Sequence, residues 1–178
     1  MRSDKARNRE SVLAAAQELF ERAGDPEEVS MDAIAAAAGV GKGTLFRGFG
    51  DRAGLIRALH ERQWSAEFAA EPGGGGPAEQ VLDLLLRVWR FKQRHRVLSL
   101  ALDRAGYGSP YRNESYDRLH AALAARVAAA GAGPQSEFLA HALIAAVRSD
   151  LVEHLHGRPA IDAEAGLRDL VARVLRPA

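Results

Sequence analysis

Residues 31–49 read Met-Asp-Ala-Ile-Ala-Ala-Ala-Ala-Gly-Val-Gly-Lys-Gly-Thr-Leu-Phe-Arg-Gly-Phe. The centre of this stretch, Gly39-Val-Gly-Lys-Gly-Thr44, has the glycines and the lysine of a phosphate-binding loop. Its spacing excludes two common nucleotide motifs. A P-loop would need glycine at Ala36 and serine or threonine at Gly43, and the dinucleotide motif would need glycine at Thr44. Both motifs also follow a buried strand, whereas the upstream alanines strongly favour a helix. The stretch therefore predicts two helices joined by a tight turn.

The predicted turn is suited to holding a short, exposed helix against a buried scaffold. Gly39 permits the positive φ that ends the first helix, and Leu45 and Phe49, four residues apart, anchor the second. The outward residues of the second helix are Lys42, Thr44 and Arg47. Such a helix fits the DNA major groove, where lysine and arginine contact phosphates or guanine, and threonine contacts a phosphate or a thymine methyl. The alternative is a helical hairpin within an all-helical core.

The composition is that of a globular protein. Of the 178 residues, 47% are hydrophobic and 26% are charged, which argues against disorder. Cysteine is absent, which excludes disulfides and thiolate metal ligands and fits a cytoplasmic protein. No apolar run reaches the roughly eighteen residues that cross a bilayer, and the charged start is not a secretory signal. We therefore expect a cytoplasmic protein with no membrane partner.

The net charge of +1 hides an uneven distribution of charge. Residues 1–9 carry four basic side chains and one acid, residues 10–32 carry seven acids and one arginine, and residues 40–62 carry five basic side chains and two acids. A local basic patch is sufficient to meet phosphates. The alternative is that these segments are ordinary solvated helix faces.

A helical period of 3.6 recurs along almost the whole chain, without convincing period-2 alternation. We predict an all-α protein of about nine helices, with N-caps at Ser30, Asp51 and Asp162. Residues 81–91 are apolar nearly all round, as in a central helix, and residues 134–155 are expected to form one helix. The basic tract from Arg87 to Arg96 is either a second nucleic-acid patch or the exposed end of a helix lying over acidic neighbours.

The clearest break in the chain is Glu71-Pro-Gly-Gly-Gly-Gly-Pro77. Four consecutive glycines cannot hold a helix, so we expect a flexible connection between helices here.

Residues 9–59 carry a long pattern of matched positions. The pattern reads Arg9-x-x-Val-Leu-x-Ala-Ala-x-x-Leu-Phe20, Gly24, Ile34-Ala35, Ala38-Gly39-Val40, Gly43-Thr44-Leu45-Phe46-x-x-Phe49 and Leu55. It resembles the TetR family of bacterial transcriptional regulators and covers under a third of the chain. The remainder agrees only in being a helical domain of the expected size.

The resemblance implies a homodimeric, ligand-responsive regulator, expected to be a repressor, that binds palindromic operator DNA. Residues 1–50 would be the three-helix DNA-binding domain and residues 51–178 the ligand-binding and dimerisation domain, with residues 51–70 as a connecting helix. The residues that the resemblance places at the DNA are Ser30, Lys42, Gly43, Thr44, Phe46, Arg47 and Arg52. The chain departs from the family pattern at Gly41, often serine, at Phe46, usually tyrosine, and at Gly48, often histidine or another polar or aromatic residue.

The resemblance also implies an effector pocket and a dimer interface in the second domain. The last two predicted helices carry apolar stripes, so we expect them to form a four-helix bundle with a partner subunit. Candidate contacts for the unknown effector are large or polar groups on the middle helices: Trp89, Phe91, Tyr107, Tyr116, His120, Phe138, His141 and Arg148. Because Asp150 is too close in sequence to share a helix face with Arg148, this arginine is expected to meet an anionic ligand or to snorkel to solvent.

No catalytic constellation, metal site or cofactor motif is found in the sequence. There is no cysteine nucleophile and no serine in a nucleophile-elbow pattern, and His154 and His156 point apart on a helix. We therefore expect a regulator and not an enzyme. The alternative is an all-helical small-molecule-binding protein with a vestigial DNA-binding unit, which is motivated by the departures at Phe46 and Gly48.

Overall fold

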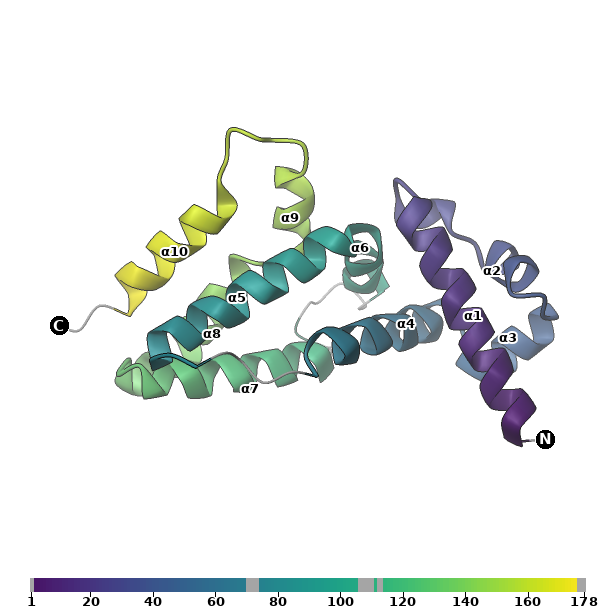
Figure 1. Cartoon of the computed structure of the whole chain (residues 1–178), viewed down its shortest axis with the longest axis horizontal. Coiled ribbons are helices and arrows are strands. Elements are labelled where there is room, and N and C mark those ends of the chain that lie inside the picture. The colour runs from purple at the N-terminus through teal and green to yellow at the C-terminus, as the bar shows by residue number, and fades with distance from the viewer. Residues whose placement is uncertain (1, 70–73, 106–110, 112–113, 176–178) are drawn as a thin grey trace. The chain divides into compact units, whose positions relative to one another are not determined.

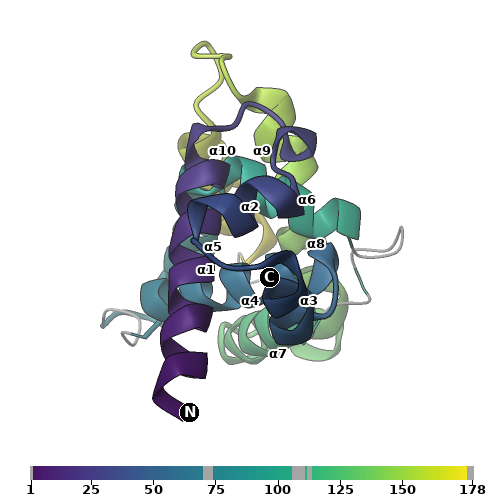
Figure 2. The same ribbon diagram turned by 90° about the vertical axis from the view of Figure 1, so that its right-hand side faces the viewer.

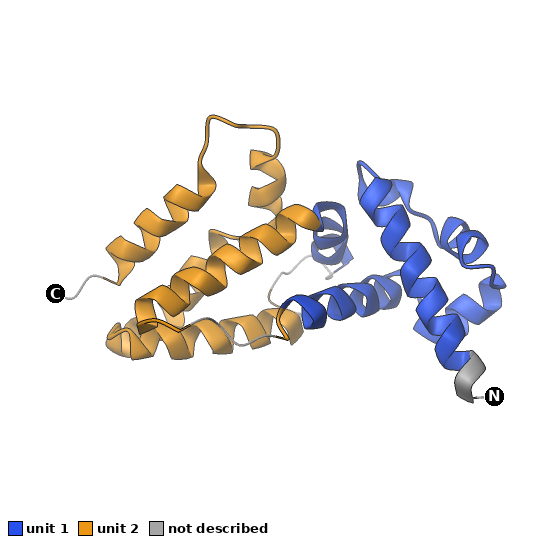
Figure 3. Cartoon of the chain, viewed as in Figure 1, with its two compact units in different colours: residues 1–67, 95–109 blue, residues 68–94, 110–178 orange. Residues whose placement is uncertain are grey.

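The computed structural model describes residues 2–69, 74–105, 111 and 114–175, with side chains from residue 5 onward. Within these ranges the chain forms ten α-helices, two 3-10 helices and no strand (Figure 1). The all-α prediction is therefore confirmed. None of the described helices combines the length and the hydropathy that a membrane span requires. The helices form two compact units, residues 1–67 with 95–109 and residues 68–94 with 110–178 (Figure 3).

The first unit is built from five α-helices and one 3-10 helix. These are α1 (Arg2–Arg22), η1 (Pro26–Glu28), α2 (Met31–Ala37), α3 (Lys42–Phe49), α4 (Arg52–Glu67) and α6 (Arg96–Ala105). The helix α1 packs against α2, α4 and α6, while α3 packs against α2 and α4. The predicted inner face of α1 is confirmed, because Val12, Ala16 and Phe20 are all buried in the core of this unit.

Side-chain caps fix where two helices of the first unit begin. Ser30 Oγ accepts a hydrogen bond of 3.1 Å from the backbone N–H of Ala33. Asp51 Oδ1 accepts one of 2.7 Å from the backbone N–H of Gly54. Both predicted N-caps are confirmed, and each satisfies a backbone donor that the helix itself leaves open.

The second unit is arranged around α5. It contains α5 (Pro77–Arg94), α7 (Glu114–Ala129), η2 (Gly133–Gln135), α8 (Ser136–Ala145), α9 (Ser149–Leu155) and α10 (Ala163–Val174). The helix α5 packs against α7, α9 and α10, and α7 packs against α8. Leu85, Val88 and Phe91 are fully buried, which confirms the prediction of a central helix. Asp162 caps α10 as predicted, with its Oδ1 2.9 Å from the backbone nitrogen of Ala165.

The prediction of one helix over residues 134–155 was wrong. The chain leaves the helical conformation after α8, and Arg148 has an extended backbone with φ −67° and ψ 150°. Its guanidinium therefore reaches the carboxylate of Asp150, with Nη2 2.9 Å from Oδ2 and Nε 3.1 Å from Oδ1. The expectation that Asp150 could not pair with Arg148 assumed that both lay within a regular helix, and this break also adds one helix to the expected count.

Two arginines of the basic tract have acidic partners within the second unit. Arg90 donates to both carboxylate oxygens of Glu164, at 2.8 and 2.6 Å. Arg87 lies 3.9 Å from Asp83 and 4.8 Å above the centre of the Phe68 ring. These contacts favour the interpretation that the tract covers acidic neighbours. Of the expected loops, residues 71–73 and 106–110 lie outside the described residues.

Candidate functional site

The turn between α2 and α3 has the geometry that its glycine predicts. Gly39 has a φ of +65°, its N–H donates to Ala36 O at 3.2 Å, and the N–H of Val40 donates to Ala35 O at 3.0 Å. These two bonds satisfy the carbonyl groups at the end of α2. Figure 2 shows the two short helices beside α1. The first three helices of the chain therefore form a helix-turn-helix unit.

The helix α3 is anchored from below and exposed above. Leu45 is 1% exposed, and Phe49 packs partly buried against the same core. The opposite surface, which we call the α3 face, consists of Lys42, Gly43, Thr44, Phe46 and Arg47. Lys42, Gly43, Phe46 and Arg47 are exposed and Thr44 is half-buried. The structure thus brings together five of the residues predicted to meet DNA.

The polar residues of the α3 face are partnered in the free protein. Lys42 Nζ lies 2.6 Å from Asp32 Oδ1, on α2, in an ion pair whose two side chains are both more than half exposed. Arg47 Nη2 lies 3.4 Å from Thr44 Oγ1. The Asp32 partner was not predicted, because the pairing depends on how α2 crosses α3. The phosphates of DNA would compete with Asp32 for the lysine.

The two other predicted DNA contacts, Ser30 and Arg52, lie outside the α3 face. Ser30 is exposed at the start of α2, where its hydroxyl caps the helix. Arg52 is half-buried, and its Nη2 donates to Pro26 O at 2.6 Å and to Val29 O at 3.4 Å. Arg52 therefore ties the connection between α1 and α2 to the start of α4. This structural role was not predicted, because the partners are more than twenty residues apart in sequence.

Arg9 is a further residue of this region that sequence reasoning did not assign to the site. Its Nη1 donates to Gly48 O at 3.2 Å, and its guanidinium carbon lies 4.5 Å from the centre of the Phe49 ring. A cation at the carbonyl end of a helix is favourable because it meets the negative end of the helix dipole. Arg9 therefore holds the C-terminal end of α3 against α1.

Three of the predicted effector contacts form one cluster in the second unit. The hydroxyl of Tyr116 lies 2.5 Å from Nδ1 of His141, and the rings of His120 and His141 stack with centroids 3.8 Å apart. Tyr111 adds an edge-on contact with Tyr116 at 5.1 Å. Burial raises the pKa of Tyr116, so its hydroxyl stays protonated at neutral pH. Within the described part of the chain, no three histidine or acidic side chains are placed to hold a metal ion.

The structure separates the remaining effector candidates. Phe91 is fully buried, and its ring meets Phe68 edge-on at 6.1 Å, so it belongs to the core. Phe138 is 72% exposed, which is the exposure of a surface residue and not of one lining a pocket. Arg148 is paired with Asp150. Tyr107 lies outside the described residues.

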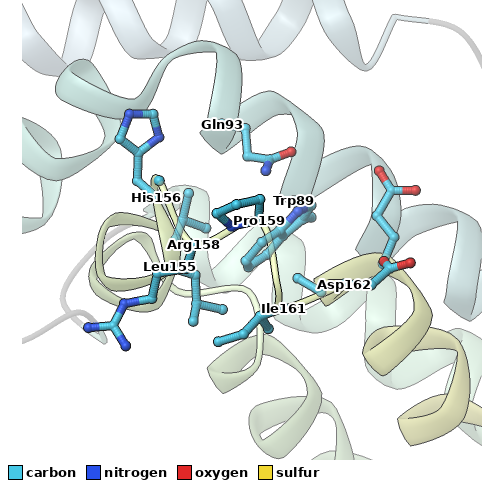
Figure 4. Close-up of a pocket in the computed structure, with 12 residues that line it drawn as sticks. Trp89, Gln93, Leu155, His156, Arg158, Pro159, Ile161 and Asp162 are labelled. Carbon is cyan, nitrogen blue, oxygen red and sulfur yellow. The ribbon is translucent and has the colours of Figure 1, made fainter.

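Trp89 lines a cavity of about 360 Å³ within the second unit (Figure 4). Its walls come from α5, from the C-terminal half of α9, and from the connection that leads into α10. Trp89 was the one effector candidate in this cavity. The other lining residues were not predicted, because most of them lie more than sixty positions away in sequence and carry no shared pattern.

Comparisons with known proteins agree with the helix-turn-helix geometry. Residues 12–59 match the family model described as bacterial regulatory proteins, tetR family. The solved structure of a TetR transcriptional regulator from Streptomyces coelicolor is 30% identical in sequence, with 96% of this chain and 99% of that chain covered and a TM-score of 0.53. A TetR transcriptional regulator from Rhodococcus sp. RHA1 is 25% identical, with 98% and 97% covered and a TM-score of 0.68.

A second regulator from Rhodococcus is 21% identical over 94% of this chain and 95% of its own, and its TM-score of 0.76 shows a shared fold. No match was found among curated proteins. Because the similarity at 30% identity extends over nearly the whole of both chains, this protein belongs to the TetR family of bacterial transcriptional regulators and carries the DNA-binding helix-turn-helix of that family.

Proposed function

We propose that this regulator is a repressor that binds palindromic operator DNA as a homodimer and is released from it by a small molecule. The observation that carries the proposal is the α3 face, a short exposed surface with two cations on a helix whose other side is buried. On DNA, Lys42 and Arg47 would contact phosphates or guanine edges. Thr44 and Phe46 would contact a phosphate or a thymine methyl, and Gly43 would leave room for the DNA backbone.

Binding would require little rearrangement of the protein. The Lys42–Asp32 pair is exposed, and exposed pairs contribute only about 0–1 kcal/mol. Ser30 lies at the N-terminus of α2, where backbone N–H groups favour a phosphate. Arg52 would add positive charge near the DNA backbone while it holds the connection before α2.

The dimer would form through α8 and α10. The exposed residues Phe138, Ala142 and Ala145 are four and three positions apart, so they share one face of α8. Small side chains beside an exposed phenylalanine allow another helix to approach closely. The two helices of each subunit would form a four-helix bundle across a two-fold axis. Two recognition helices would then lie about 34–36 Å apart, one turn of DNA.

The effector would act by favouring a dimer whose recognition helices no longer match this spacing. Such coupling is reciprocal, so DNA and effector would each weaken the binding of the other, typically by about 1–3 kcal/mol.

The test is fluorescence anisotropy with DNA from immediately upstream of the gene, titrated at several salt concentrations. A scrambled duplex controls for sequence, and a Lys42→Ala, Arg47→Ala double variant removes both cations of the α3 face. The matched control is Arg22→Ala, which removes an exposed arginine that lies about 20 Å along α1 from Arg9.

The proposal expects tight, selective binding that weakens steeply with salt, is lost in the double variant and survives in Arg22→Ala. Equal weak binding to both duplexes calls for a genome-wide selection of bound fragments. An empty selection would favour the alternative of a small-molecule-binding protein with a vestigial DNA unit.

A further inference from the structure

The cavity beside Trp89 has the size of a small-molecule site. Its volume of about 360 Å³ falls within the range of about 300–1,000 Å³ that is typical of ligand pockets. Trp89 is only 3% exposed, so its indole is a fixed part of the wall. All of the lining residues belong to the second unit: Trp89, Gln93, Val152, Leu155, His156, Gly157, Arg158, Pro159, Ile161, Asp162, Ala163 and Glu164.

The apolar part of the cavity favours a flat ring. Figure 4 shows Pro159 and Ile161, from the connection after α9, beside the indole of Trp89. Ile161 is 48% exposed and is one of few large apolar side chains with such exposure among the described residues. Aromatic ligands gain most from stacking on an indole and from covering such an exposed apolar side chain.

The two carboxylates of the cavity already have partners. Asp162 caps α10 through the N–H of Ala165, and both oxygens of Glu164 accept hydrogen bonds from Arg90. The hydrogen bonds from Arg90 hold the pKa of Glu164 below its ordinary value of 4.5, so this carboxylate stays ionised and paired. Neither acid is therefore open to a cationic ligand.

The other polar side chains of the cavity are neutral or cationic. Gln93, His156 and Arg158 are exposed, and within the described part of the chain no hydrogen bond or ion pair of these side chains is found. An amide, an imidazole and a guanidinium can all donate to a carboxylate. The mouth of the cavity therefore favours an anion over a cation.

We infer that this cavity is the effector site and takes a small planar aromatic acid, with the ring against Trp89 and Ile161 and the carboxylate near Gln93 and Arg158. The inference rests on the proposed function in one respect, that a small molecule controls the regulator. Occupation of the cavity is a separate property that can be measured without DNA.

The test uses the fact that the chain has only two tryptophans. Trp64 is half-exposed on α4, where it stacks on His60 with ring centroids 5.8 Å apart, and Trp64→Phe keeps an aromatic ring there. In this variant the single indole N–H signal in an NMR spectrum belongs to Trp89. We would titrate it with 1-naphthoate, 1-naphthamide and 1-naphthylmethylamine, which share one ring system but carry an anionic, a neutral and a cationic group.

We expect 1-naphthoate to shift the Trp89 signal and to bind about tenfold more tightly than 1-naphthamide, a difference of about 1.4 kcal/mol, with the amine weakest. Arg158→Gln should abolish the preference for the acid over the amide. The matched control, Arg173→Gln, removes an exposed arginine of α10 that does not line the cavity and should retain the preference. Ile161→Glu, at an exposed position, should prevent binding of 1-naphthoate without unfolding the chain.

Three results would overturn the inference: no shift of the Trp89 signal with any of the three compounds, equal or tighter binding of the amine, or an unchanged acid preference in Arg158→Gln. A separate anisotropy titration with operator DNA tests control by the ligand. Binding at Trp89 without release of DNA would keep the ligand site and refute its role as the effector site. Failure to bind any operator would refute the proposed function and leave the NMR result unaffected.

Discussion

At the scale of single residues, the recognition helix is positioned by groups that are distant in sequence. Arg9 holds the C-terminal end of α3 through the carbonyl of Gly48, and Arg52 fixes the connection before α2. Gly54 acts by its lack of a side chain, because a Cβ at this position would lie 2.1 Å from the carbonyl oxygen of Phe49. The first turn of α4 therefore approaches the end of α3 at a distance that only glycine permits.

Gly54→Ala should destabilise the first unit by about 1–3 kcal/mol, as other overpacking substitutions do. The reason is that the atom in the way belongs to the backbone, which cannot rotate aside as a flexible side chain can. Thermal unfolding followed by circular dichroism measures the effect. Gly48→Ala is the matched control, since a Cβ there meets nothing within 4 Å. An unchanged melting temperature in Gly54→Ala would refute the close approach of the two helices.

The charge of three carboxyl groups determines how stability depends on pH. A backbone hydrogen bond from Glu27 lowers the pKa of Asp25, and hydrogen bonds from Arg148 and Arg90 lower the pKa values of Asp150 and Glu164. A lowered pKa in the folded state contributes stability above the unfolded value and loses it as the pH falls through the folded value.

We therefore expect a melting temperature that is nearly constant from neutral pH to about pH 5 and falls below about 4, close to the ordinary pKa values of these groups. Glu164→Gln should melt at a lower temperature at neutral pH and show a shallower fall in acid. Differential scanning calorimetry without DNA measures both. A melting temperature that rises on acidification would contradict the assignment.

At the scale of elements, α3 combines a buried anchor with an exposed face that has no side chain at Gly43. A Cβ at this position would meet nothing within 4 Å of the protein itself. Alanine is also a better helix former than glycine, by about 1 kcal/mol. The absence of a side chain at residue 43 therefore has no explanation in the packing of the unit.

Gly43→Ala should leave the protein as stable as before or more stable, and should weaken operator binding by about tenfold, or about 1.4 kcal/mol. The physical reason is that the methyl group would occupy the space into which the DNA backbone is proposed to come. Anisotropy and thermal unfolding, measured on the same variant, separate the two effects. If Gly48→Ala, on the same helix, weakens binding equally, the cause would be a stiffer helix and not the close approach.

Helix boundaries were predictable where a cap or turn residue marked them. Ser30, Gly39 and Asp51 each identified a boundary correctly, because each acts through backbone groups within four residues. The break before α9 was missed, since no proline or glycine marks it and the apolar spacing continues through Arg148. Local periodicity does not show where a chain leaves a helix so that a charged side chain can find its partner.

The same limit applies to the candidate site. The α3 face was predictable because its residues follow one another on a single helix. The contacts of Arg9 with α3 and of Lys42 with Asp32 depend on helix packing, which the spacing of residues does not encode. The cavity was missed apart from Trp89, because its other walls come mainly from the connection between α9 and α10.

At the scale of the whole molecule, the proposed dimer determines whether two recognition helices can bind one operator. Phe138 is the most exposed large apolar side chain of the described residues, and Ala142 and Ala145 lie on the same face of α8. An isolated α3 face would bind a half-site weakly, so operator affinity should depend on this surface.

Phe138→Glu should convert a dimer into a monomer, because the charge would be buried without a partner in the proposed interface. Light scattering coupled to size exclusion measures the mass, and anisotropy should show operator affinity falling with it. Ala125→Glu introduces the same charge at an exposed position of α7 and should remain dimeric. A Phe138→Glu protein that stays dimeric would place the interface elsewhere.

The helix α6 follows α5 in the chain, yet its buried residues Val97, Leu98, Ala101 and Leu102 share one core with α1 and α4. Its two arginines also reach back to the start of the chain, Arg104 to the carboxylate of Asp25 and Arg96 to the carbonyl of Gly24. The operator-reading part is therefore not a transplantable module with one junction. A chimera built by joining residues 1–67 to a foreign sensor domain would lack one wall of its core, and would fold only if the foreign domain supplied a helix in place of α6. New effector specificities are then more easily acquired by substitutions around the cavity than by exchange of the whole second half of the gene.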